Sequence, residues 1–113
     1  MKTVDVLTKA KELISQPDNW YKGHFTHPDK PDCFCIMGAI GKALGIDVNS
    51  FIPSEDLHHM MYNPASEAIR KLIQSEHGGI SGFNDSPKTD HAKVMTAFDL
   101  AIASVDKNSR VYR

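Results

Sequence analysis

The segment CIMGAIGKAL, residues 35–44, is apolar on almost every side when it is drawn as a helix. Its large side chains alternate with glycine and alanine, and only Lys42 requires water. A helix that is apolar all round is buried at the centre of a fold. Each glycine inside it costs up to about 1 kcal/mol of helix propensity, so Gly38 and Gly41 indicate that neighbouring elements approach closely. We therefore predict a central helix over Cys35 to Leu44, ended by Gly45.

Amphipathic helices are predicted on both sides of this segment. Residues 4–15 place apolar side chains at spacings of three and four, with Thr3 as N-cap and Pro17 as the stop. A short helix is expected over 54–61. Asn63 and Pro64 begin another, which ends at 77–79, and Asp90 caps a last helix that continues to Val105.

Two long connections separate these helices. Gln16 to Asp32 holds several prolines and a glycine, which argue against a regular element, and its aromatic residues are expected to hold the loop in place. His77 to Asp90 is the second connection, in which only Ile80 to Phe83 could pair as a short strand. Long ordered loops often carry function, so we expect functional residues in these two.

The fold class that follows is all-α, a compact single-domain bundle of four to five helices around a buried central helix. A chain of 113 residues with 41% apolar and 24% charged residues supports one core of ordinary composition. We predict one domain over residues 1–105 and a polar C-terminal tail over 106–113.

Charge and apolar patterning exclude several classes of function. The chain has 13 Lys and Arg against 14 Asp and Glu, too even a balance for general nucleic-acid binding. The longest uncharged apolar run, Cys33 to Gly41, is too short to span a bilayer, and the first residues do not resemble a secretory signal. With only two cysteines in the sequence, we expect a cytoplasmic protein with reduced thiols.

Several motifs resemble those of a known family. They are Trp20-x-x-Gly23-x-Phe25, the run from Cys33 to Ile40, Phe83-Asn84-Asp85-Ser86-Pro87, His91-Ala92-Lys93-Val94 and Phe98-Asp99-x-Ala101-Ile102. In this order they resemble the DUF6197 family, small bacterial and bacteriophage proteins of unknown function. The resemblance implies a compact domain of bacterial or phage origin and no particular activity.

One candidate catalytic set lies within these motifs. Cys35 begins the central helix, where the helix dipole favours a thiolate. His91 or His24 could act as its base, and Asn84 or Asp85 could orient that base. This arrangement would suit a cysteine-dependent hydrolase or transferase. The alternative reading is a core cysteine, because free cysteine is among the most buried residue types.

A metal site and a nucleotide site are both weakly supported by the sequence. His24, His27, Cys33 and Cys35 are zinc-competent residues, but the Cys-x-Cys pair and the short linker do not match common zinc spacings. The glycine-rich segment 78–85 lacks the Lys-Ser/Thr pair of a phosphate-binding loop. We therefore predict neither a metal nor another cofactor.

The function favoured by the sequence is a non-enzymatic interaction or regulatory factor with a protein partner. Trp20, His24, Phe25 and Phe83 are the predicted binding residues, because they are aromatic or polar groups in the two long loops. Whether Trp20 and the candidate catalytic residues meet in one cleft is the geometric question that the structure must answer.

Overall fold

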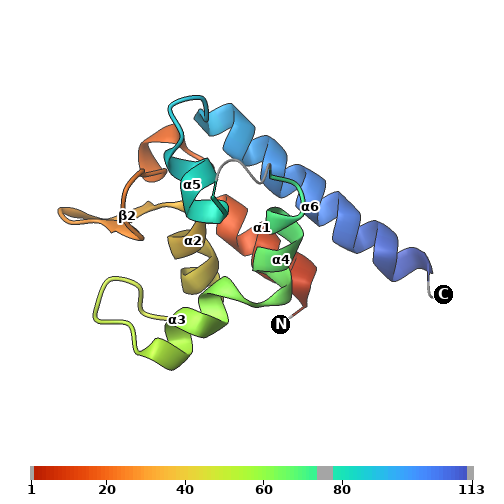
Figure 1. Ribbon diagram of the computed structural model, residues 1–113, viewed down its shortest axis with the longest axis horizontal. Helices are drawn as coiled ribbons and strands as arrows, with labels where there is room; N and C mark the ends of the chain where they lie inside the picture. Colours follow the sequence, from red (N-terminus) through yellow and green to blue (C-terminus); the bar gives the residue numbers. More distant parts are fainter. Residues whose placement is uncertain (1, 74–77, 112–113) are drawn as a thin grey trace.

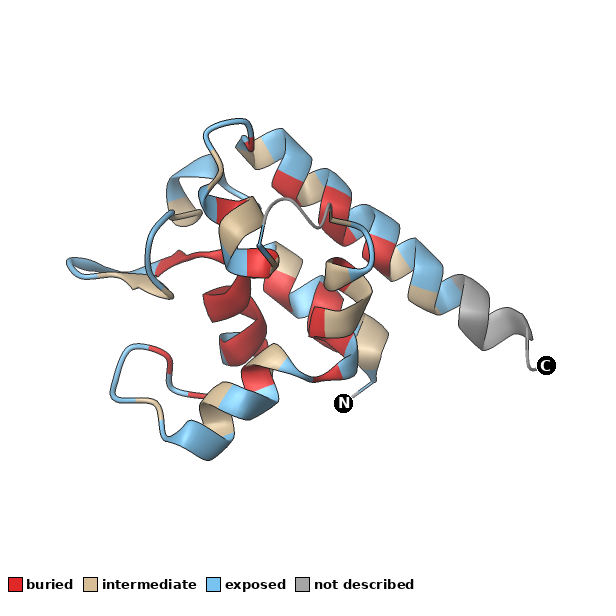
Figure 2. Ribbon diagram, in the orientation of Figure 1, coloured by how far each residue is buried: buried red, intermediate tan, exposed pale blue. Residues whose placement is uncertain are grey.

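The predicted central helix is confirmed. In the computed structural model, which describes residues 2–73 and 78–111 (side chains through 106), helix α2 (Ile36–Ala43) lies at the centre of the protein. Every residue of α2 except Lys42 is buried, so the helix is red almost throughout in Figure 2. Gly45 follows it with a φ of 88°, the left-handed conformation in which glycine ends a helix.

Five further helices surround α2 in the part of the chain that the structure describes (Figure 1). They are α1 (Thr3–Leu13), α3 (Ser54–Met61), α4 (Pro64–Arg70), α5 (Ile80–Asp85) and α6 (His91–Val111). Helix α1 packs against α2 and α6, and α4 packs against α6. Fully buried Leu7, Ile40 and Phe98 contribute to the core that they share. Burial of each such side chain stabilises the fold by about 1.5–3 kcal/mol.

Most of the predicted helix starts are confirmed by capping hydrogen bonds. The Asn63 side chain accepts from the amides of Ala65 and Ser66 at the start of α4. The Asp90 carboxylate accepts from the Lys93 amide at the start of α6, at 2.9 Å. At α1, Thr3 is the first helical residue and not the N-cap that the sequence predicts. Short polar side chains at these positions bond amides that the helix itself leaves free.

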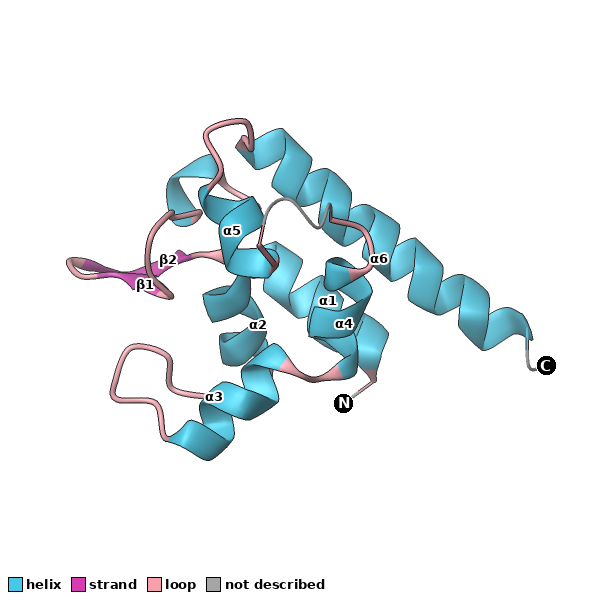
Figure 3. Cartoon of the chain, viewed as in Figure 1, coloured by secondary structure: helices cyan, strands magenta, loops and turns pink. Residues whose placement is uncertain are grey.

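The prediction of a purely α-helical fold is wrong in one respect. Between α1 and α2 the chain forms a 3₁₀ turn (Pro17–Asn19) and an antiparallel pair of strands, β1 (Thr26–His27) and β2 (Lys30–Phe34) (Figure 3). The strands are short, and their exposed residues give no clean alternation of apolar and polar side chains. Tertiary packing specifies this hairpin, because Phe34 at its end is buried in the core.

Three element boundaries also differ from prediction. Ile80 to Phe83 is helical, as part of α5, with Ile80 and Asn84 buried one turn apart. A short apolar run cannot be assigned to strand or helix by periodicity alone. Helix α4 ends at Arg70, and its expected end at His77 lies outside the described residues. Helix α6 continues past Val105 to Val111, into the predicted tail, and its end projects from the body (Figure 1).

The close approach that the two glycines of α2 predict is confirmed. A Cβ atom on Gly38 would lie 2.0 Å from the carbonyl oxygen of Phe25, so this position admits only glycine without movement. The same carbonyl accepts a hydrogen bond from the Cys35 amide, at 3.3 Å. The loop between the 3₁₀ turn and β1 is therefore held directly against the start of α2.

Candidate functional site

Asn84 is the centre of a hydrogen-bond network that joins the two long loops to α2. Its side chain is fully buried at the end of α5. The oxygen Oδ1 accepts from the indole Nε1 of Trp20 at 2.7 Å and from the amide of Ile36 at 3.0 Å. The nitrogen Nδ2 donates to the Tyr21 carbonyl at 3.0 Å. A residue that the sequence suggests as a catalytic orienter is therefore fully occupied in joining three segments.

Asp85 extends this network to the turn before β1. Its Oδ1 atom accepts from the Gly23 amide and from Asn84 Nδ2, both at 2.9 Å. Gly23 has a φ of 111°, which glycine adopts readily, so the turn can present its amide to the carboxylate. Neither of the two ion pairs in the described part of the chain involves Asp85.

Cys35 is the N-cap of α2 and has a neutral thiol at physiological pH. Its sulfur accepts from the Gly38 amide at 3.3 Å, and the residue is only 5% exposed. Burial raises the pKa of the Cys35 thiol to about 11, and the nearby Asp85 carboxylate adds to this effect. The backbone amides of Gly38 and Met37 act in the opposite direction but do not overcome desolvation. Since the thiolate is the nucleophilic form, this environment opposes covalent catalysis.

We expect the stability of the protein to fall between pH 9 and pH 11 as a result. The pKa of Cys35 is raised from 9.0 in the unfolded chain to about 11 when folded, so the protonated thiol favours the folded state. Its contribution is complete below pH 9 and is lost as the pH rises through 11, by up to about 3 kcal/mol.

Urea unfolding at several pH values, with Cys35→Ser as the control, measures this loss. A serine hydroxyl can still accept from the Gly38 amide but does not titrate in this range. The difference in free energy of unfolding between wild type and Cys35→Ser should therefore change by this same amount between pH 9 and pH 11. A difference that stays constant from pH 8 to pH 11 would contradict the raised pKa.

His91 bonds to the end of α1 and not to another candidate catalytic residue. Its Nε2 atom lies 2.7 Å from the Ile14 carbonyl oxygen, and its ring centroid is 6.1 Å from that of Trp20. Both contacts join α6 to the end of α1 and to the Trp20 loop. His24, by contrast, lines a small cavity together with Cys35 and the two residues at the end of α5.

That cavity opens beside a much larger groove. The cavity has a volume of about 40 Å³, and the groove has about 640 Å³. Both are lined by Gly23, His24, Phe25 and Ser81. The groove's remaining lining comes from β1 and from the α2–α3 connection and α3: Thr26, Val48, Asn49, Ser50, Ile52 and Leu57. Asn49 Nδ2 donates to the Pro31 carbonyl of β2 at 3.2 Å, which joins the α2–α3 connection to the hairpin.

Only one wall of this groove is predicted from the sequence. His24 and Phe25 are two of the predicted binding residues and line it. Trp20 is instead bonded to Asn84, and Phe83 lies beside Leu72 and Leu100 in a separate hollow of about 220 Å³. The opposite wall, residues 48–57, was not predicted. The sequence offers one signal for it, the aromatic Phe51 in a segment rich in turn-forming residues, and the structure shows this side chain 89% exposed.

The four zinc-competent residues do not form a metal site in the structure. Cys33 donates its thiol proton to the Asp18 carbonyl, at 3.1 Å, and Cys35 accepts from α2. His27 uses Nδ1 to accept from the Asp29 amide in the hairpin turn. Among residues 2–73 and 78–106, no three His, Cys, Asp or Glu side chains are grouped as a metal ion would require.

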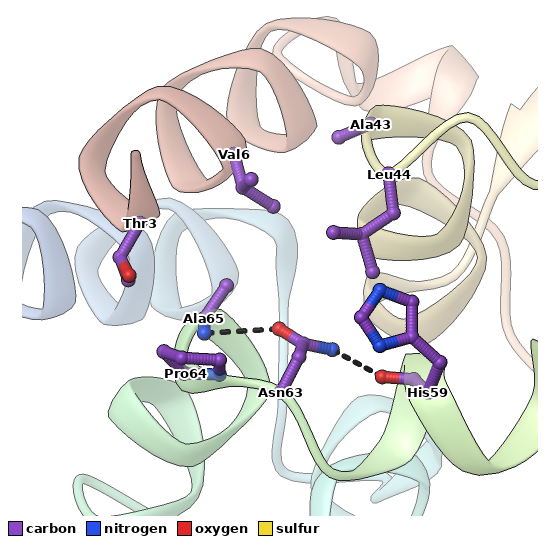
Figure 4. Close-up of a pocket in the computed structure, with 8 residues that line it drawn as sticks. All are labelled: Thr3, Val6, Ala43, Leu44, His59, Asn63, Pro64 and Ala65. Carbon is purple, nitrogen blue, oxygen red and sulfur yellow. Dashed lines mark hydrogen bonds between the residues drawn. The ribbon is translucent and has the colours of Figure 1, made fainter. Parts of the chain in front are cut away.

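A further hollow, of about 350 Å³, lies between α1, the end of α2 and the α3–α4 turn (Figure 4). Its buried polar side chain, Asn63, is saturated. Oδ1 accepts from the two amides at the start of α4, and Nδ2 donates to the carbonyls of His59 and Met60. Asn63 therefore stabilises the α3–α4 turn and has no amide proton left for a ligand.

The fold and site define a small, mainly helical protein with one groove beside a hydrogen-bonded loop network. The chain belongs to the DUF6197 family, a family of unknown function whose model matches residues 1–104. No curated protein and no solved structure matches it. No helix among the described residues is long and apolar enough to cross a membrane.

Proposed function

We propose that this protein is a non-enzymatic binding module, of bacterial or phage origin, that recognises a protein partner through the groove. The observation that carries the proposal is the exposed Phe51 beside the groove. Aromatic side chains are enriched among residues that dominate binding energy. Two free, buried cysteines support the cytoplasmic location that we also propose.

Unpaired backbone on both walls of the groove adds support. The amides of His24, Phe25, Phe51 and Ile52 donate no hydrogen bond within the described part of the chain. Backbone amides that donate no internal hydrogen bond can pair with an extended segment of another protein. Val48, Ile52 and Leu57 provide apolar surface between them. The groove therefore suits a polypeptide better than a highly charged polymer.

The alternative function, a cysteine-dependent hydrolase or transferase, has one observation in its favour. Cys35, His24, Asn84 and Asp85 line the same small cavity. Two features oppose it. The pKa of the Cys35 thiol is raised to about 11, and the Asn84 side chain is fully used in binding backbone and Trp20. Rapid labelling of Cys35 by iodoacetamide at neutral pH would favour the enzyme.

Replacing Phe51 with serine is expected to weaken partner capture by at least about tenfold, the effect of losing a binding hot spot. Tagged wild-type and variant proteins would be compared as baits in bacterial lysate at equal concentration. Leu100→Ser is the matched control, because Leu100 is 52% exposed on α6, away from the groove. The proposal predicts that the wild-type and Leu100→Ser baits retain at least one lysate protein that the Phe51→Ser bait does not retain. Equal retention by all three baits, or no retained protein, would contradict it.

A further inference from the structure

The Asp85 carboxylate faces the small cavity with one oxygen unused. Oδ1 accepts from Gly23 and Asn84, whereas Oδ2 has no hydrogen-bond partner in the described residues. Lys22 does not neutralise it by direct contact, since its ammonium donates to the Ser86 carbonyl and lies over the Trp20 ring. Asp85 is an exposed residue, and its free carboxylate oxygen can attract a cationic group of a ligand.

The cavity limits the size of that group. Its volume of about 40 Å³ is far smaller than the 640 Å³ of the adjoining groove. An ammonium group is the smallest cationic group of a polypeptide, so it suits this space better than a guanidinium does. Besides Asp85, the Ser81 hydroxyl lines the cavity and makes no hydrogen bond within residues 2–73 and 78–111. Its oxygen can accept a hydrogen bond from the ammonium group.

Three other groups border the same space. Cys35 is a neutral thiol, and Asn84 is fully bonded, so neither competes for the carboxylate. The exposed imidazole of His24 lines both the cavity and the groove, and its ring makes no ion pair with Asp85. The Asp85 charge is therefore available to a ligand that enters from the groove.

We propose that the cavity binds the α-ammonium group of a polypeptide N-terminus, and that the groove holds the residues that follow in an extended conformation. The inference rests on the proposed function and gives the chemistry of its partner. An α-ammonium group is joined directly to the main chain. When it lies at Asp85, the next residues therefore reach the unpaired amides of His24 and Phe25 in the adjoining groove wall. A lysine ammonium at Asp85 would instead place four methylene groups between the cavity and the main chain that could pair with these amides.

Titration of the ¹⁵N-labelled protein with two tripeptides at pH 7 tests this inference. The probes are Ala-Val-Ala-amide with a free N-terminus and the same peptide acetylated. We expect the free peptide to shift the amide signals of Gly23 and Ser81. Acetylation should weaken binding by at least about tenfold, because it removes a charged hydrogen-bonding group.

Asp85→Asn should weaken binding of the free peptide by a similar factor. An asparagine in this position can still accept from the Gly23 amide and Asn84 through Oδ1, so the loop network is preserved. Asp90→Asn is the matched control: it removes the same charge from an exposed carboxylate that also accepts from a backbone amide, but at the start of α6. The control should bind the free peptide as wild type does.

Each other outcome overturns a defined part of the inference. If both tripeptides bind equally well, the cavity is not an ammonium site, and only the groove remains as a binding site. If Asp85→Asn and Asp90→Asn weaken binding of the free peptide equally, the effect is due to net charge and not to a site at Asp85. Nα-acetyl-lysine amide binding as tightly as the free peptide would assign the cavity to lysine. If no probe binds, the N-terminal site is wrong, and the Phe51 experiment still decides the proposed function independently.

Discussion

Replacing Asn84 with alanine is expected to lower the free energy of unfolding by about 3–5 kcal/mol, a large part of the stability of a domain of this size. The variant leaves the Trp20 indole N–H, the Ile36 amide and the Tyr21 carbonyl without the partners that the wild type provides. Each polar group left buried and unpaired costs about 1–3 kcal/mol. The Ile36 amide matters most, because it belongs to the first turn of the central helix.

Urea unfolding followed by far-ultraviolet circular dichroism measures this loss without relying on Trp20, whose own environment changes. Asn49→Ala is the matched control. Asn49 is exposed and makes one side-chain hydrogen bond, to the Pro31 carbonyl, so its replacement should cost no more than about 0.5 kcal/mol. If Asn84→Ala proved as mild as the control, Asn84 could not be the residue that holds the two loops to α2.

The central helix and its caps could be predicted because their signals are local. An apolar surface on every side is a property of residues 35–44 alone, and Asn63 followed by Pro64 is a local start signal. The hairpin carries no such signal. β1 has two residues, and β2 is exposed at Lys30 to Asp32 before its buried end, so packing against the core decides its conformation.

The candidate site shows the same division. The sequence indicates that Cys35, Asn84 and Asp85 carry polar chemistry, but not what each of them bonds. Asn84 contacts residues 48 to 64 positions away along the chain, and no spacing rule predicts contacts at such separations. The second wall of the groove was missed for a related reason. Residues 48–52 form an irregular loop, and only its tertiary position opposite His24 and Phe25 makes it part of a site.

Gly38→Ala is expected to destabilise the protein by about 2–4 kcal/mol, more than overpacking usually costs. The added Cβ would lie 2.0 Å from the Phe25 carbonyl oxygen, and the nearest distance that real Cβ atoms show is 3.0 Å. The carbonyl would therefore have to move by at least about 1 Å. It cannot move freely, because it accepts from the Cys35 amide and the following residues enter β1.

Gly41→Ala on the same helix separates this contact from the general effect of removing a glycine. Both substitutions gain about 1 kcal/mol of helix propensity. A Cβ at Gly41 would meet the Cε atom of Met60 at 2.7 Å and a methyl group of Val48 at 2.8 Å. Both contacts are with side chains and not with backbone, and the methionine end is flexible, so we expect a smaller cost than at Gly38, below about 1.5 kcal/mol. Urea unfolding of the two variants measures the difference.

Gly38→Ala should also lose binding of the free tripeptide, because moving the Phe25 carbonyl displaces the groove wall of residues 23–26. Equal stability of the two variants would mean that this wall yields easily, and that the close approach of Phe25 to α2 does not fix the groove.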